Sequence, residues 1–397
     1  MFLFGHNQIS QSQADRIAKN VLRHQPLIDL HVDLPVVLRY RYHNDLFKTD
    51  YDGPLSGHVD LERLQKGGSG GFFSIAFAPC PKDSPKGDED EEERNRLFLQ
   101  PSNSVRDTLE QIDITHQLVA QYSDQIASAT SPKDILHNFK NGKINHLIGV
   151  EGAHLLGNSL GTLRTFYDLG ARYLTLTHTC HNAFADTSGS SENEAAKPLH
   201  GGLSAYGKRL IREMNRLGMI VDVSHTSDDT TKQAIVHSEA PVVFTHSGAR
   251  TINNHTRNVP DEILELVSEK SGRDAVIGIP ALPSFVAIEP ERQTVQTVAD
   301  HVEHIAKVAG KSRVAIGSDF DGFLQEPISG LEDVSKYSNL LSELASRGWT
   351  QAELKGLVSG NFLRVFGKIE SIGKAHSRKG TKADTKPWNA RTDLGLT

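Results

Sequence analysis

Eight short apolar runs spread over residues 26–319 constrain the fold of this chain more than any other feature. Each run has the length and the β-branched content of a strand that is buried on both faces, as in a parallel sheet. Amphipathic stretches separate the runs, as an alternation of strands and helices requires. The eight runs cover residues 26–34, 71–78, 144–150, 171–177, 219–223, 241–245, 275–279 and 314–318.

This alternation predicts an α/β fold of the (β/α)8 TIM-barrel type, because eight such units can close into one parallel barrel. No linker rich in proline, glycine or serine divides the chain before the eighth run, so we expect a single domain over residues 1–372. Residues 373–397 are polar and weakly periodic, and we expect a tail that packs loosely on the barrel or extends from it. The functional groups of such a barrel lie at the carboxyl ends of its strands.

Composition and charge exclude several classes of partner. Lys and Arg number 43 and Asp and Glu 49, so the net charge is −6 and provides no basic surface for nucleic acid. No apolar run reaches the ~18 residues of a membrane span. The apolar start is too short for a secretory signal, and the end lacks the apolar tail of a lipid-anchor signal. We therefore expect a soluble protein without a membrane partner and favour the cytoplasm, although the sequence does not identify the compartment.

An acidic stretch follows the second predicted strand. Residues 82–96 include six consecutive acidic side chains, at positions 88–93. Like charges in a row repel each other and stay hydrated. We expect a mobile surface loop here rather than an ion site.

Five potential metal ligands stand at the ends of four predicted strands. One such residue alone is often only a buried core residue, but an unpaired buried charge is costly, and five together are hard to explain in that way. Zinc prefers imidazole nitrogens and accepts carboxylate oxygens, and no CxxC pair competes for it. The set predicts two Zn²⁺ ions ~3.5–4 Å apart that hold a hydroxide between them. The five ligands are His31, Asp33, Glu151, His225 and His246.

Three further residues can complete a reaction centre. His178 ends the fourth predicted strand and could donate a hydrogen bond to an oxyanion. Asp319 ends the eighth and could move a proton. Arg257, in the loop after the sixth, suits the capture of a substrate carboxylate, although arginines are also common on surfaces. We assign supporting or loop-capping roles to Asp222 and Asp321. The remaining loop histidines near these strand ends, which we expect to face solvent, are His154, His181, His200 and His255.

Several of these segments, in this order, resemble the membrane (renal) dipeptidases of peptidase family M19. The resemblance covers about residues 27–366 and is carried by five motifs. These are GVEGAH (149–154), GARYLTLTHTC (170–180), VDVSH (221–225), RNVPD (257–261) and GSDFDG (317–322). The segment LHVD (30–33) departs from the family's opening motif but keeps both ligands.

The resemblance implies a binuclear zinc barrel. One zinc ion would lie on His31, Asp33 and Glu151. The other would lie on Glu151, His225 and His246. The acidic stretch at 82–96 also departs from the animal enzymes, which bears on membrane attachment and not on the ligands.

The resemblance also implies that His178 steadies the tetrahedral intermediate, that Arg257 holds the C-terminal carboxylate of the substrate, and that Asp319 passes a proton to the leaving amine. We therefore expect a zinc-dependent metallo-dipeptidase, which cleaves dipeptides with a free C-terminal carboxylate through a metal-bridging hydroxide. Two alternatives stay open. One is another amidohydrolase reaction, such as N-acyl amino-acid deacylation, and the other is an inactive barrel kept for binding. Dipeptides would be the small-molecule partners, and related enzymes suggest a homodimer.

The two cysteines also match positions that some members of the family bridge. Cys80 follows the second predicted strand and Cys180 lies just beyond the fourth. One expectation is a disulfide across the barrel mouth, and the other is two free buried thiols. A disulfide would favour an oxidising compartment.

Overall fold

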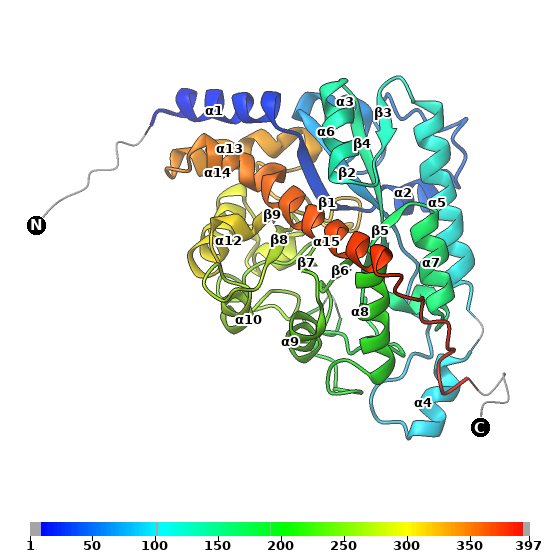
Figure 1. The fold of residues 1–397 in the computed structure, drawn as a ribbon. Helices are drawn as coiled ribbons and strands as arrows, with labels where there is room; N and C mark the ends of the chain where they lie inside the picture. The colour runs from blue at the N-terminus through cyan, green and yellow to red at the C-terminus, as the bar shows by residue number, and fades with distance from the viewer. Residues whose placement is uncertain (1–8, 101, 191, 392–397) are drawn as a thin grey trace, which may run out of the picture.

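Eight parallel strands close into a barrel in the computed structural model, which describes residues 9–100, 102–190 and 192–391 (Figure 1). The eight barrel strands are β1 (Leu27–Val32), β2 (Ser69–Ala76), β4 (Ile144–Glu151), β5 (Ala171–Thr175), β6 (Ile220–Asp222), β7 (Val242–Phe244), β8 (Ala275–Ile279) and β9 (Val314–Ile316). Closure follows from β2, which pairs with β1 along one edge and with β4 along the other. Each of the eight apolar runs overlaps one of these strands, so the predicted (β/α)8 barrel is confirmed.

A ninth strand, β3 (Ile126–Ser128), was not predicted from the sequence. It pairs with the first residues of β4, where Ile126 faces Ile144, whereas β5 pairs with the last residues of β4. Since β2 occupies the opposite edge of β4, β3 and β5 share one edge in succession. The strand therefore extends the sheet without opening the barrel.

Helices surround the strands (Figure 1). Between β1 and β5 lie α2 (Leu34–Tyr42), α3 (Leu61–Gly67), α4 (Glu91–Phe98), α5 (Ser104–Gln121), α6 (Pro132–Lys140) and α7 (Leu160–Asp168). Between β5 and β9 lie α8 (Ala205–Leu217), α9 (Asp228–His237), α10 (Asp261–Leu266), α11 (Pro283–Val286) and α12 (Val295–Val308). Before β1 lies α1 (Gln11–His24). After β9 lie α13 (Tyr337–Ser346), α14 (Gln351–Lys355), a π-helical turn (Gly356–Gly360) and α15 (Asn361–Arg378).

Apolar side chains fill the barrel, and α15 crosses its amino end (Figure 1). Phe73 of β2 packs against Tyr173 of β5 and against Phe362 of α15, with ring centroids 4.9 and 5.7 Å apart. The side chain of Asn361 donates a hydrogen bond to the carbonyl of Val314, the first residue of β9, at 2.8 Å. This end is thus a packed core, and the polar strand ends gather at the opposite end.

The last part of the acidic stretch, residues 91–96, belongs to a helix where we expected a loop, whereas residues 82–90 lie in a loop as expected. The side chain of Asp90 accepts a hydrogen bond from the backbone N–H of Glu93 at 2.9 Å, which caps the start of α4. The acidic residues at positions 91–93 occupy the first turn, where the helix dipole favours negative charge. For residues 91–96 the expectation was wrong because it counted only the mutual repulsion of the charges and not their place at a helix start.

The described part of the C-terminal segment returns to the barrel after α15, which itself continues past residue 373. Asp384 accepts two hydrogen bonds from the guanidinium of Arg209, at 2.7 and 2.8 Å. Trp388 stacks on Tyr206, with ring centroids 6.2 Å apart. Arg209 and Tyr206 both belong to α8.

Among the described helices, none has the length and apolar character needed to cross a bilayer.

Candidate functional site

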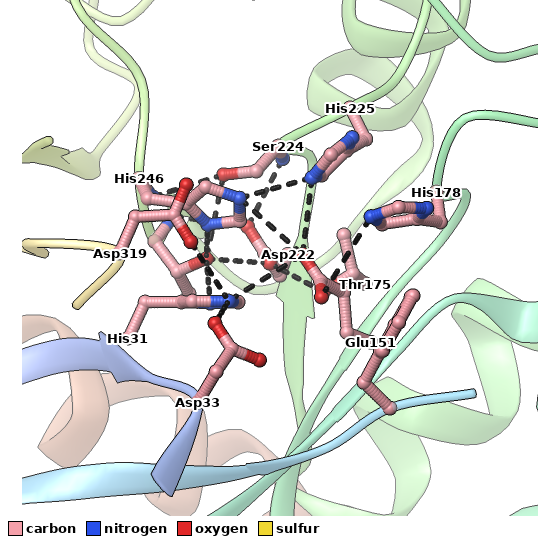
Figure 2. A network of polar contacts seen from close by, with 12 residues as sticks. His31, Asp33, Glu151, Thr175, His178, Asp222, Ser224, His225, His246 and Asp319 are labelled. Atoms are coloured by element: carbon pink, nitrogen blue, oxygen red, sulfur yellow. Dashed lines mark hydrogen bonds and ion pairs between the residues drawn. The ribbon is translucent and has the colours of Figure 1, made fainter. Parts of the chain in front are cut away.

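The eight predicted site residues lie in one region at the carboxyl ends of the strands, and Figure 2 labels all of them except Arg257. His31 belongs to β1 and Asp33 follows it, and Glu151 is the last residue of β4. All of the eight are buried except His178, which is partly exposed. The remaining five follow β5, β6, β7 and β9 and are His178, His225, His246, Arg257 and Asp319.

One carboxylate oxygen of Glu151 is the centre of this arrangement. Glu151 Oε1 lies 3.0 Å from His225 Nε2, 3.3 Å from His246 Nε2 and 3.4 Å from His31 Nε2. His31 Nε2 is also 3.4 Å from Asp33 Oδ2. Three overlapping groups of potential ligands result, and Glu151 and His31 each belong to two of them.

The donor atoms fit a divalent transition metal. His31 Nε2 is buried and has no hydrogen-bond partner in the described part of the chain, although two carboxylates lie beside it. Imidazole nitrogens and carboxylate oxygens together make up the ligand sets of catalytic zinc sites. Both cysteines of the chain are held in a disulfide, so no thiolate competes. A bound cation would satisfy the buried nitrogen and the clustered carboxylates at once.

Tyr173 supports His31, and the sequence did not single it out. Its hydroxyl oxygen lies 2.9 Å from His31 Nδ1, the nitrogen that points away from the other ligands. Gly149 makes room for the phenol ring, because a Cβ at that position would lie 2.3 Å from a ring carbon of Tyr173. Partners on the far nitrogen of a ligand histidine fix its orientation and its tautomer.

The side of the site at β1 and β9 retains protons. Burial raises the pKa of Asp33 to about 6 and the pKa of Asp319 well above its usual value. Burial alone would lower the pKa of His31, but attraction to Glu151 and Asp33 raises it well above its usual value. Without a cation, this crowded group of acids is stabilised by shared protons.

The side at β6 and β7 behaves in the opposite way. Burial lowers the pKa of His225 well below its usual value, and the nearby Arg257 guanidinium adds to the effect. Burial likewise lowers the pKa of His246, together with repulsion from His31. These imidazoles are neutral near pH 7, which is the form that binds a metal.

His178 and Arg257 adjoin this second side. The His178 ring lies 4.3 Å from the ring of His225, and burial lowers the pKa of His178 to about 4. Arg257 is buried over the ring of Phe285 and donates one hydrogen bond to the carbonyl of His246, at 3.2 Å. Burial lowers the pKa of Arg257 to about 10, so the group keeps its charge near neutral pH.

The backbone is strained at three acidic or histidine residues of the site. His225, Asp319 and Asp321 have φ angles of 66°, 64° and 69°, in the left-handed region that residues other than glycine rarely adopt. Strain of this kind collects at functional sites, where the surrounding structure holds it in place. At Asp321 the carboxylate accepts a hydrogen bond from the backbone N–H of His58 at 2.5 Å, consistent with the predicted loop-capping role.

The model of the membrane dipeptidases (peptidase family M19) matches residues 15–380 of this chain. The dipeptidase verJ of Clonostachys rogersoniana is 39% identical over 364 residues, which are 91% of this chain and 89% of that protein. The chain belongs to the membrane dipeptidase family. It is accordingly a metallo-dipeptidase, and its activity depends on a metal.

Solved structures agree with the fold of this family member. The probable dipeptidase PvdM of Pseudomonas aeruginosa has a TM-score of 0.76 at 22% identity, over 91% of this chain and 99% of that chain. A metallo peptidase of Rhodobacter sphaeroides, liganded with a phosphinate mimic of the dipeptide L-Ala-D-Ala, has a TM-score of 0.71 at 24% identity, over 87% and 99%. Both likenesses support the barrel.

We expected the loop histidines of this dipeptidase to face solvent, but they do not. His154, His181 and His255 are buried, and His200 is partly buried. His154 Nε2 lies 2.9 Å from the carbonyl oxygen of Ala78, and His181 Nδ1 lies 3.0 Å from the Asp186 carboxylate. The expectation was wrong because the loops above the strands pack on one another and bury the rings.

A disulfide joins Cys80, in the loop after β2, to Cys180, in the loop after β5. The two Cα atoms are 6.0 Å apart, and 100 positions of sequence separate them. Of the two alternatives for these cysteines, the bridged one is confirmed. The bridge ties together two loops of the barrel mouth next to the candidate site.

Proposed function

We propose that this metallo-dipeptidase uses two Zn²⁺ ions, one on His31, Asp33 and Glu151 and one on Glu151, His225 and His246. The observation that carries the proposal is the approach of three imidazole Nε2 atoms to within 3.4 Å of one oxygen of Glu151. A carboxylate with two oxygens can serve two ions from this position. When bound, such a pair supplies a Lewis acid and lowers the pKa of a water molecule between the ions.

His178 would stabilise the carbonyl oxygen of the scissile bond. Its pKa of about 4 keeps the ring neutral near pH 7, so one ring nitrogen carries a hydrogen to donate. Its Nε2 lies 4.0 Å from Glu151 Oε2, beside the proposed zinc ligands. A donor fixed at that point stabilises the negative charge that develops on the oxygen during attack.

Asp319 would deliver a proton to the leaving amine. Because burial raises its pKa well above the usual value, this carboxyl keeps its proton to a higher pH than an exposed aspartic acid does. Its Oδ1 lies 3.8 Å from His31 Nε2, at the edge of the ligand group. A buried acid with a raised pKa is suited to general acid catalysis.

Arg257 would select substrates with a free carboxylate. Its buried Nε has no hydrogen-bond partner in the described ranges, and one of its terminal nitrogens donates a hydrogen bond to the carbonyl of His246. The guanidinium has five N–H donors, so several remain for a ligand. A bidentate pair with the C-terminal carboxylate of a dipeptide would use them and would disfavour longer peptides, which place that carboxylate elsewhere.

The decisive experiment combines metal analysis of the purified protein with a panel of L,L-dipeptides, L,D-dipeptides and N-acyl amino acids. We expect two zinc ions per chain and turnover of dipeptides. Turnover of the N-acyl amino acids alone would support the deacylase alternative, because they share the free carboxylate that Arg257 would bind. Absence of turnover across the panel, with full metal occupancy, would support the inactive binding barrel.

We further infer an oxidising compartment for the working enzyme. The bridge between Cys80 and Cys180 is the observation behind this inference, since disulfides persist mainly outside the cytoplasm. The inference replaces the cytoplasmic expectation drawn from composition. Fractionation followed by thiol labelling of the protein from its native source would test it, and reduced thiols there would contradict it.

A further inference from the structure

The buried carboxylate of Asp222, at the end of β6, connects three strands behind the proposed metal site (Figure 2). Its Oδ1 accepts hydrogen bonds from the backbone N–H groups of Ser224 and Thr245, both at 3.0 Å. Its Oδ2 accepts hydrogen bonds from the hydroxyls of Thr175, at 2.6 Å, and Thr245, at 2.7 Å. The carboxylate therefore links the carboxyl ends of β5, β6 and β7.

The hydroxyl of Thr245 has one hydrogen and two close partners, the carboxylate of Asp222 and the ring of His246. A carboxylate can only accept, so the contact of 2.7 Å with Asp222 requires that hydrogen. The other neighbours of Thr245 Oγ1 on this side, Ser224 Oγ and His31 Nδ1, lie at 3.4 and 3.5 Å and compete poorly for it. The hydroxyl oxygen therefore turns a lone pair towards His246 Nδ1, which lies 2.8 Å away.

The direction of this contact decides the tautomer of His246. Its Nδ1 must carry the hydrogen and donate to Thr245, which leaves a lone pair on Nε2. That Nε2 is the atom 3.3 Å from Glu151 Oε1, within the proposed ligand group. His225 has no such partner, because its buried Nδ1 is without a hydrogen bond in the described residues.

We propose that Asp222 is a positioning residue, which through the hydroxyl of Thr245 holds His246 in the tautomer that presents Nε2 to a metal ion. The inference rests on the proposed function, because it takes His246 as a ligand. It adds that a residue without direct contact to the metal sets much of the affinity at β7. Partners of this kind typically contribute a factor of about 10–100 in metal affinity.

The substitution Asp222→Asn tests the direction of the contact. The amide oxygen can still accept from the two backbone N–H groups, so the NH₂ group takes the position facing the two threonine hydroxyls. The amide then donates to Thr245, and the threonine hydrogen is free to turn to His246 Nδ1. This favours the opposite tautomer, with the hydrogen on Nε2, which cannot bind a metal. We expect a loss of zinc affinity of about 10–100-fold, measured by chelator competition on the full chain.

Two threonine variants form a matched pair. Thr175→Val and Thr245→Val each remove one hydroxyl that hydrogen-bonds to Asp222 Oδ2, so both variants share the loss of that hydrogen bond. Only Thr245 touches His246. We expect Thr245→Val to weaken zinc binding about tenfold and Thr175→Val to leave it within about threefold of the wild type. Thr245→Ser, which keeps the hydroxyl, should restore the affinity.

The double variant Asp222→Asn with Thr245→Val is the sharpest test. Without the hydroxyl, the asparagine can no longer impose the wrong tautomer, so the double variant should bind zinc more tightly than Asp222→Asn alone. Additive losses, or equal affinities for Thr175→Val and Thr245→Val, would overturn the inference. If Asp222→Asn does not fold, the threonine pair alone decides.

Nitrogen NMR of the metal-free protein with labelled histidines separates this inference from the proposed function. We expect His246, assigned by its own substitution, to carry the hydrogen on Nδ1 in the wild type and on Nε2 in Asp222→Asn. An Nε2–H tautomer in the wild type would overturn the inference even if zinc binds. A wild type with the Nδ1–H tautomer that binds no zinc would instead contradict the proposed function.

Discussion

The two halves of the site respond to protons in opposite ways, although they share Glu151. The acidic half, made of His31, Asp33 and Asp319, holds its protons to a higher pH than isolated side chains do. The imidazole half, made of His225 and His246 beside the cationic Arg257, releases them. A metal ion at the imidazole half would find neutral ligands, whereas one at the acidic half would have to displace protons.

The stability of the metal-free protein should depend on pH with opposite signs in the two halves. The pKa of Asp33 is raised to about 6, so the folded protein holds a proton there that the unfolded chain has lost. Its contribution to stability therefore falls as the pH rises from about 4 to about 6. The lowered pKa of His246 has the reverse effect, because the unfolded chain gains a proton as the pH falls below about 6.5.

Loss of the shared carboxylate should have the largest effect on both halves. We expect Glu151→Gln to weaken both ions, because an amide is a poor bridge between two cations, and to lower kcat by about 10³-fold or more. Lewis-acid stabilisation of the transition state contributes several kcal/mol, and each ~1.4 kcal/mol of activation free energy changes the rate tenfold. Metal content and turnover of the purified variant would be measured together. Loss of one ion only would mean that the halves do not share Glu151.

His178 should affect chemistry without affecting either half as a metal site. We expect His178→Ala to lower kcat by roughly 10²–10³-fold, as for removal of one donor to a developing oxyanion. Zinc content should stay at the wild-type value, because neither proposed zinc ion uses His178 as a ligand. A variant that loses metal in proportion to activity would make His178 a part of the imidazole half.

Arg257 should add substrate selectivity to the imidazole half. Charge-assisted hydrogen bonds are worth ~1.5–3 kcal/mol, so Arg257→Met should lower kcat/KM for a free dipeptide by about one to two powers of ten. The C-terminal amide of the same dipeptide serves as the control, because it cannot form the pair. Equal acid-to-amide ratios in wild type and variant would show that Arg257 does not bind the substrate carboxylate.

The burial of the acidic half should lower the free energy of unfolding when the metal is removed. We expect metal-free Asp33→Asn to be more stable than the metal-free wild type at pH 8, by about 1–3 kcal/mol, because a buried charge is removed. The difference should vanish at pH 4, where the carboxyl holds its proton in the folded wild type. Denaturant unfolding at the two pH values measures both quantities. A less stable variant at pH 8 would mean that the pair with His31 outweighs the burial of Asp33.

The sequence predicted the barrel and the place of the polar strand ends because both depend on local patterns. A run of apolar residues that stops at a histidine or a carboxylate marks the end of a buried strand, as at Glu151 and His246. The short strand β3 escaped notice, since three residues with partly exposed side chains carry no period. Its pairing depends on the edge that β4 leaves free.

The supporting residues of the site were harder to predict for a different reason. Tyr173 and Thr245 stand inside apolar runs, where a single polar atom cannot be distinguished from core packing. Their importance lies in contacts across the barrel, to His31 Nδ1 and His246 Nδ1, and no local pattern encodes those. The buried loop histidines were misjudged in the same way, because burial of a loop depends on the loops beside it.

The bridge between Cys80 and Cys180 also turns part of the chain into a closed covalent ring. This ring contains Glu151 and His178, and it contains the exposed acidic residues at the start of α4. A protease that cuts once between the two cysteines would leave both fragments joined, and the two would separate only after reduction. The exposed acidic start of α4 is thus enclosed in the same loop of chain as the shared carboxylate, and a single cut there cannot detach either fragment.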